Sequence, residues 1–117
     1  MKPFVPRRTG KAGPEAKIAK DWVDFLLIRG WFCIKTHGNE FQSGLPDYFC
    51  THSKFGIRWT EIKNPGKFAF TPAQIDTFPK MIANGAGVWI ITAATEEEYA
   101  KLFQPCNYWQ YANGWIK

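Results

Sequence analysis

Three ionisable residues at strand spacing are the part of the sequence best suited to chemistry. Asp47 opens one short apolar run, and Glu61 and Lys63 lie two residues apart near the end of the next. Residues i and i+2 of a β-strand project from the same face, so Glu61 and Lys63 should lie together. Burying ions without partners costs roughly several kcal/mol each. A divalent cation is the simplest compensating partner, and the carboxylates of Asp47 and Glu61 suit Mg²⁺.

The length and charge of the chain limit the remaining possibilities. At 117 residues the sequence has room for one domain with a modest core. Its 15 Lys and Arg residues exceed its 10 Asp and Glu residues, which gives a net charge of +5. A positive balance suits a polyanionic partner such as nucleic acid, although charge alone reports solubility as much as binding.

Cysteine content and hydropathy indicate the compartment. Cys33, Cys50 and Cys106 are odd in number and show no Cys-x-x-Cys spacing, which favours a reduced, intracellular setting. Met1 is not followed by an apolar segment of a secretory signal, and no apolar run approaches the roughly 20 residues of a membrane span. We therefore expect a cytoplasmic protein without a membrane partner.

Residues 1–13 read as a flexible basic arm. Prolines and glycines separate basic residues there, and this composition cannot bury enough apolar area to order itself. The arm either tracks phosphates or is an ordinary disordered terminus. Its candidate phosphate contacts are Arg7, Arg8 and Lys11.

The first helix is predicted from Pro14 to about Arg29, with Gly30 as its stop. Its buried stripe recurs at three- and four-residue steps and comprises Ile18, Trp22, Phe25 and Leu26. Glu15 falls on the same stripe, which would point it toward the sheet near the other acids. Alternatively, Glu15 complements the helix dipole, a contribution of about 0.3–1 kcal/mol.

Three strands follow, at Trp31 to Thr36, Asp47 to His52 and Ile57 to Lys63. A turn is expected at His37 to Asn39, and a hairpin through Ser53 to Gly56 should join the second and third strands.

A second helix begins after Thr71, whose hydroxyl, together with Pro72 and Gln74, forms a capping-box pattern. It should bury Ile75, Phe78 and Ile82, and Pro79 should bend or interrupt it.

The C-terminal third contains a strand, a helix and an aromatic segment. Val88 to Ile91 has the continuous apolar character of a strand covered on both faces, and Thr95 caps a helix that reaches about Phe103. Residues 105–117 form an aromatic extension in which Asn113 and Gly114 are expected to turn a hairpin. This segment would cover the core, stack on bases or bury itself in a second subunit. The order α-β-β-β-α-β-α predicts an α/β fold, with helices packed on a mixed sheet.

The ordered set of these residues resembles the PD-(D/E)xK nuclease superfamily, and its spacing resembles the VRR-NUC branch and the related Holliday-junction resolvases. The resemblance covers Glu15 to about Phe103 and leaves residues 1–13 and 105–117 outside the nuclease domain, 14–104. It rests on Gly44-Leu45-Pro46-Asp47, Glu61-Ile62-Lys63 and Gln74, with Glu15 on the first helix.

The resemblance implies a restriction-endonuclease-like fold and a magnesium site, with Mn²⁺ as a substitute. Asp47, Glu61 and the backbone carbonyl of Ile62 would be ligands, and Glu15 would complete the site directly or through water. Lys63 would lie beside the attacking water or the scissile phosphate. Gln74 would contact the substrate or steady the site, although its capping role is sufficient by itself. The remaining candidate contacts to nucleic acid are Lys35, His37, Asn39 and Lys67.

Two alternatives remain open. Cys33 and His37, with Cys50 and His52, offer the thiolate and imidazole ligands of a zinc site, although their spacing is that of adjacent strands. Otherwise Glu61 and Lys63 form a salt bridge on an exposed strand.

The resemblance therefore implies a small Mg²⁺-dependent endodeoxyribonuclease, of the kind that phages and bacteria encode, that acts on branched or junction DNA. Cutting opposed strands would require two active sites, so we expect a homodimer. The alternative from another class is a non-catalytic nucleic-acid-binding module that uses only charge and aromatic stacking.

Overall fold

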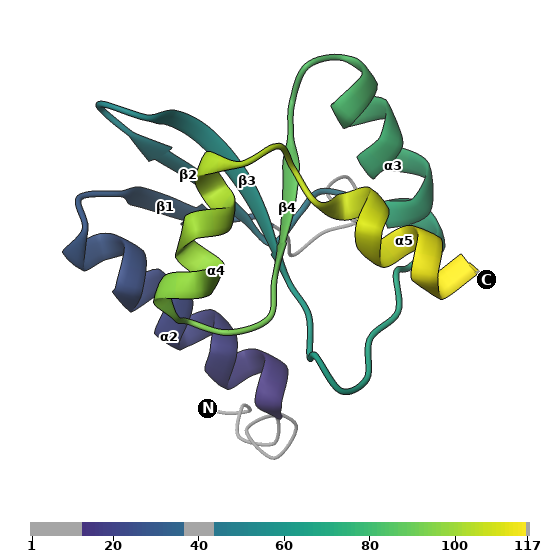
Figure 1. The fold of residues 1–117 in the computed structure, drawn as a ribbon, viewed down its shortest axis with the longest axis horizontal. Helices are drawn as coiled ribbons and strands as arrows, with labels where there is room; N and C mark the ends of the chain where they lie inside the picture. The colour runs from purple at the N-terminus through teal and green to yellow at the C-terminus, as the bar shows by residue number, and fades with distance from the viewer. Residues whose placement is uncertain (1–12, 37–43, 117) are drawn as a thin grey trace, which may run out of the picture.

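The computed structural model describes residues 13–36 and 44–116, and among residues 113–116 it describes the backbone alone. Four strands form one sheet in the order β1-β2-β3-β4 (Figure 1). Strands β1 (Phe32–Lys35), β2 (Tyr48–His52) and β3 (Gly56–Ile62) are antiparallel neighbours, and β4 (Val88–Ile91) runs parallel to β3. This arrangement confirms the predicted mixed sheet.

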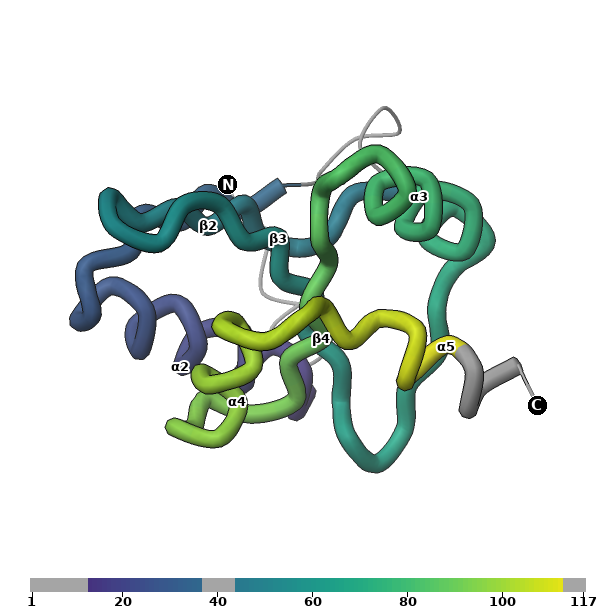
Figure 2. The backbone as a smooth tube through the Cα atoms, turned by 45° about the horizontal axis from the view of Figure 1, so that its top comes forward, coloured from purple at the N-terminus to yellow at the C-terminus, as the bar shows by residue number. Residues whose placement is uncertain are grey.

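Helices lie on both faces of the sheet (Figures 1 and 2). Helix α2 (Pro14–Ile28) lies against β1 and β3, and α4 (Glu96–Ala100) lies on the same side as α2. Helices α3 (Pro72–Ala83) and α5 (Tyr108–Ile116) contact β4 from the other side. A short 3-10 turn, η2 (Lys101–Phe103), extends α4. Among the residues that the structure describes, no helix lies over the other face of β1 to β3.

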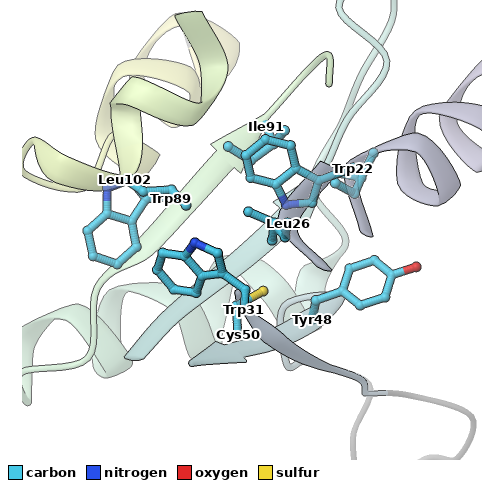
Figure 3. Packing of buried hydrophobic residues seen from close by; sticks show 9 residues of the cluster. Trp22, Leu26, Trp31, Tyr48, Cys50, Trp89, Ile91 and Leu102 are labelled. Atoms are coloured by element: carbon cyan, nitrogen blue, oxygen red, sulfur yellow. The ribbon is translucent and has the colours of Figure 1, made fainter. Parts of the chain in front are cut away.

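The buried residues form two clusters, one on each side of β4. The first lies under α2 and is shown in Figure 3; its largest members are Trp22, Trp31, Trp89 and Tyr48. The second lies under α3 and α5 and contains Phe70, Phe78, Val88, Ile90, Tyr108 and Ala112. All four β4 residues are buried, as the apolar run predicted.

Local sequence accounts for the beginnings and ends of the elements. The β2–β3 hairpin turns into Gly56, whose φ of 87° lies in the left-handed region that favours glycine. Thr71 caps α3: its Oγ accepts the Gln74 backbone N–H at 3.1 Å, and the Gln74 side chain accepts the Thr71 N–H at 3.0 Å. Thr95 caps α4 as predicted, since its Oγ accepts the Glu98 N–H at 3.2 Å, while Glu98 Oε1 accepts the Thr92 N–H at 2.9 Å.

The structure bears on three expectations about the helices. Helix α3 is continuous through Pro79 to Ala83, so Pro79 does not interrupt it, while a bend at Pro79 stays a prediction. Ile75, expected to be buried, is exposed. The segment around Asn113 and Gly114 is the end of helix α5, not a hairpin.

The aromatic C-terminal segment packs on the protein's own core. Tyr108 and Ala112 are buried in the cluster that contains Phe78. Just before α5, the Asn107 side chain accepts the Ile90 N–H at 2.6 Å and donates to the Ile90 carbonyl at 3.1 Å, which covers the outer edge of β4. Among the helices described, none is both long and apolar enough to cross a membrane.

Candidate active site

Asp47 and Glu61 are brought side by side at the point where β2 begins and β3 ends. The Asp47 backbone N–H donates to Glu61 Oε1 at 3.0 Å, and the Ile62 N–H donates to Asp47 Oδ2 at 2.9 Å. Each carboxylate therefore binds the strand that carries the other. Thr36 holds the backbone on which Asp47 lies. Its N–H donates to the Asp47 carbonyl at 2.8 Å, and its hydroxyl donates to the Pro46 carbonyl.

Lys63 lies on the same face as Glu61, as the strand spacing predicted. Its Nζ is 3.1 Å from Glu61 Oε2, and it donates to the Ala69 carbonyl at 2.8 Å and to Gln74 Oε1 at 3.2 Å. An ammonium group has three N–H donors, so these three acceptors account for all of them. The side chains of Lys63 and Glu61 are 7% and 3% exposed, so the alternative of a salt bridge on an exposed strand is wrong.

Gln74 ties the start of α3 to the acid pair. Its Nε2 donates to Glu61 Oε2 at 2.9 Å, while its Oε1 accepts from both Lys63 and the Thr71 N–H. The two roles considered for Gln74, helix capping and support of the site, are therefore carried by one side chain in one orientation. Sequence reasoning missed Thr36 and the Ala69 carbonyl, because neither a strand-end threonine nor a loop carbonyl carries a recognisable pattern.

The electrostatics of the pair favour a cation. The pKa of Glu61 is raised to about 7, first by burial and then by the charge of Asp47, while the contacts with Lys63 and Gln74 oppose the rise. At neutral pH the site thus holds two adjacent acids whose full ionisation is costly.

A hollow of about 250 Å³ opens beside this pair. Glu15, Lys35 and Asp47 supply its charged lining, and Tyr48 and Ile62 lie at its inner surface. Glu15, in the first turn of α2, is exposed rather than part of the buried stripe. Its Oε2 accepts the Asn64 N–H at 3.3 Å. The structure therefore places Glu15 at the hollow, but outside the hydrogen-bonded group of Asp47, Glu61, Lys63 and Gln74.

The donor set fits a hard cation such as Mg²⁺. Two carboxylates offer about four acceptor positions each, so Asp47 and Glu61 can bind an ion while keeping their backbone hydrogen bonds. Mg²⁺ commonly takes one or two carboxylates and fills its other positions with water or phosphate. In the part of the chain that is described, no three His, Cys, Asp or Glu side chains are grouped as metal ligands. Asp47, Glu61 and the Ile62 carbonyl remain the predicted ligands, with Glu15 as a more distant candidate.

The zinc alternative finds no support in the contacts of His52. Its Nε2 lies 3.2 Å from the Arg29 carbonyl, and its Nδ1 accepts the Lys54 N–H at 3.0 Å, so both ring nitrogens have partners. Cys33 and Cys50 face each other across β1 and β2. His37 lies outside the described residues.

Two of the predicted phosphate contacts are described. Lys35 and Lys67 are both exposed, and neither makes an ion pair with another residue described in the structure. By contrast, six of the other basic residues are paired with acids: Lys17, Lys20, Arg29, Lys63, Lys80 and Lys101. Arg7, Arg8, Lys11, His37 and Asn39 lie outside the described residues.

Comparisons with known proteins locate this arrangement among solved folds. No protein-family model matches the sequence, and no curated protein matches it either. A solved structure described as a VRR_NUC domain superposes with a TM-score of 0.65, covering 80% of this chain and 98% of that one at 19% sequence identity. At this identity the likeness establishes the fold. The chain therefore has the fold of a VRR_NUC domain, the fold that the ordered positions of Asp47, Glu61 and Lys63 predicted.

Proposed function

We propose that this protein is a Mg²⁺-dependent endonuclease that hydrolyses phosphodiester bonds in DNA. The observation that carries the proposal is the interlocked pair of Asp47 and Glu61, with the pKa of Glu61 raised to about 7, at the edge of a hollow. The likeness to a VRR_NUC domain supports the same reading, since that name denotes a nuclease.

In this proposal Asp47, Glu61 and the Ile62 carbonyl hold the ion. A bound Mg²⁺ supplies a more acidic water and neutralises charge on the phosphate. Asp47 lines the hollow directly, whereas Glu61 is fixed from behind by Lys63 and Gln74. Lys63 then acts first through Glu61, because it holds the orientation and the negative charge of that carboxylate. To bind a phosphate, Lys63 would have to give up one of its three present hydrogen-bond acceptors.

Lys35 and Lys67 are exposed cations without an ion pair among the described residues, and we assign them to the substrate. Lys35 lines the hollow with Asp47, and Lys67 follows Lys63 on the loop before α3. Phosphate groups are bound by such lysines as point charges. We place the scissile strand across the hollow, with Lys35 beside the acid pair and Glu15 at its rim. The basic arm with Arg7, Arg8 and Lys11 would extend this contact.

We propose branched DNA as the substrate and a homodimer as the active form. Junction cleavage on opposed strands needs two active sites, which a two-fold dimer provides. The uncovered face of β1 to β3 supports self-association. Phe32, Ile34 and Ile57 are 59%, 46% and 52% exposed there. Phe49 and Trp59 pack edge to face beside them, with ring centroids 5.1 Å apart.

The test of the proposed function is metal-dependent cutting of supercoiled plasmid and of a synthetic four-way junction. We expect cutting with Mg²⁺ or Mn²⁺ and none with a chelator. Asp47→Asn should abolish it, and Lys80→Ala, on the exposed surface of α3, should not. Salt-sensitive DNA retention without cutting at any metal concentration would instead establish the non-catalytic binding module.

A further inference from the structure

Two thiols face each other across the first two strands, close to the candidate site but outside its hydrogen-bonded group. Cys33 of β1 and Cys50 of β2 are direct partners in the antiparallel register. Both belong to the packing under α2, where Cys50 is fully buried and Cys33 is partly buried (Figure 3 shows Cys50). Both are free thiols.

The register already provides the backbone spacing that a disulfide needs. Directly opposed residues of an antiparallel pair have Cα atoms about 4.5–5.5 Å apart. Disulfides span Cα separations of about 4.4–6.8 Å. Side chains of opposed residues also point to the same face. A bond between Cys33 and Cys50 would therefore require rotation of the side chains, with no change in strand pairing.

The two thiols differ in reactivity in a way that suits thiol–disulfide exchange. Cys33 lines a hollow of about 500 Å³ between α2 and β1, together with Lys20 and Lys35. The hydrogen bond from Cys50 lowers the pKa of Cys33, in spite of the opposing effect of burial. The same hydrogen bond, together with burial, raises the pKa of Cys50. The accessible thiol is thus also the more acidic one, and only a thiolate attacks a disulfide.

We propose that Cys33 and Cys50 are a reversible oxidation site, at which exchange with a small-molecule disulfide forms a cross-strand bond. The Cys33 thiolate attacks one sulfur of oxidised glutathione, forming a mixed disulfide and releasing one glutathione thiolate. Cys50 then loses its proton and attacks Cys33 Sγ, which expels the second glutathione. Two protein thiols are oxidised, and one glutathione disulfide is reduced to two thiols.

The bond would act on residues of the candidate site. Lys35 lies two residues after Cys33, and Tyr48 lies two residues before Cys50. Lys35 and Tyr48 are also paired across the two strands, and both line the 250 Å³ hollow. Cys50 would give up its 3.6 Å contact with Thr60 Oγ. Intracellular disulfides of this kind are usually transient and redox-sensing. The inference depends on the register and the thiols, and it stands or falls independently of the proposed nuclease chemistry.

The experiment is peptide mapping of the full chain after incubation with oxidised glutathione, without reduction. We expect a Cys33–Cys50 linked peptide lacking two hydrogen atoms, reversed by dithiothreitol. Cys106, a partly buried thiol, serves as the internal control and should carry at most glutathione. In Cys50→Ser the reaction should stop at glutathionylated Cys33, and in Cys33→Ser Cys50 should remain a free thiol.

Circular dichroism of the wild type and both serine variants would check that each is folded. A mixed disulfide that persists on wild-type Cys33 would overturn the proposal, because it would mean that Cys50 cannot reach it. Equal modification of Cys33 and Cys106, with no linked peptide, would overturn it as well.

Discussion

Asp47 and Glu61 each bind the backbone beside the other: the Asp47 N–H donates to Glu61 at 3.0 Å, and Asp47 accepts the Ile62 N–H at 2.9 Å. The two acids are thereby held at one place by the strands themselves, before any ion binds. Pre-organisation of this kind means that substitutions here should change folding as well as activity, and the two effects must be measured separately.

The buried pair of Glu61 and Lys63 should show strong energetic coupling. Because removing one partner leaves the other charge buried, Glu61→Gln or Lys63→Met alone should each lower the free energy of unfolding by about 3–5 kcal/mol. The double variant should cost less than the sum of the two single changes. Urea unfolding measures all three. Lys80→Met, which breaks the exposed pair with Asp76, is the control and should cost about 0–1 kcal/mol. Additive costs would mean that the pair is not coupled.

Stability should depend on pH through Glu61. Its pKa is raised from 4.5 to about 7 in the folded protein. The folded state therefore binds more protons than the unfolded state between these values, and stability falls as pH rises through them. Without divalent ions, the wild type should lose up to about 3 kcal/mol between pH 4.5 and pH 7 relative to Glu61→Gln. If the free energy of unfolding changed with pH in the same way in both proteins, the pKa of Glu61 would not be raised on folding.

Magnesium should reverse this trend. A metal ion binds deprotonated carboxylates, so Mg²⁺ should raise the melting temperature more at pH 8 than at pH 5. Thermal unfolding with Mg²⁺, compared with a chelator, measures the difference. In Asp47→Asn the increment should disappear at both pH values, and an unchanged increment would exclude Asp47 as a ligand.

Variants of Gln74 and Thr71 can distinguish the capping of α3 from the support of the acid pair. Thr71→Ala removes the cap alone and should cost about 1 kcal/mol. Gln74→Ala also removes the hydrogen bond to Glu61, and it should cost about 1–3 kcal/mol while weakening Mg²⁺ binding by about 10- to 100-fold. Calorimetric titration with Mg²⁺ would distinguish the variants. Equal metal affinities in both would reduce Gln74 to a capping residue.

Lys35 should contribute to DNA binding, whereas Lys54, on the β2–β3 hairpin, should not. Both are exposed, and neither has an ion pair among the residues described. Lys35→Ala should reduce the salt dependence of binding by about one released counterion, since it removes one phosphate contact beside Asp47. Affinities measured at several salt concentrations in the presence of Ca²⁺ would show this. A similar loss in Lys54→Ala would indicate non-specific attraction only.

The open face of β1 to β3 should mediate the proposed dimer. Ile34→Asp places a charge among exposed apolar side chains, so it should convert a dimer to a monomer in sedimentation or light-scattering measurements. Ile28→Asp is the matched control, because Ile28 is 82% exposed at the end of α2. A wild type that is monomeric at the concentrations of the activity assay would refute the dimer.

The sequence by itself determined the elements from α2 to α4 and the order of the chemical residues. Apolar spacing located α2 and the strands, hydroxyl caps located α3 and α4, and the strand period put Glu61 and Lys63 on one face. These features depend on interactions between residues close in the chain, which a sequence displays directly.

Only the tertiary structure decided how those residues are used. Lys63 turns inward because the Gln74 side chain and the Ala69 carbonyl, from the next segment, accept hydrogen bonds from its ammonium group. Glu15 is exposed and accepts the Asn64 N–H instead of joining the buried stripe, and the aromatic tail is helical with Tyr108 packed against Phe78. Each outcome depends on a partner distant in sequence, and the periodicity of the sequence does not indicate which residue that partner is.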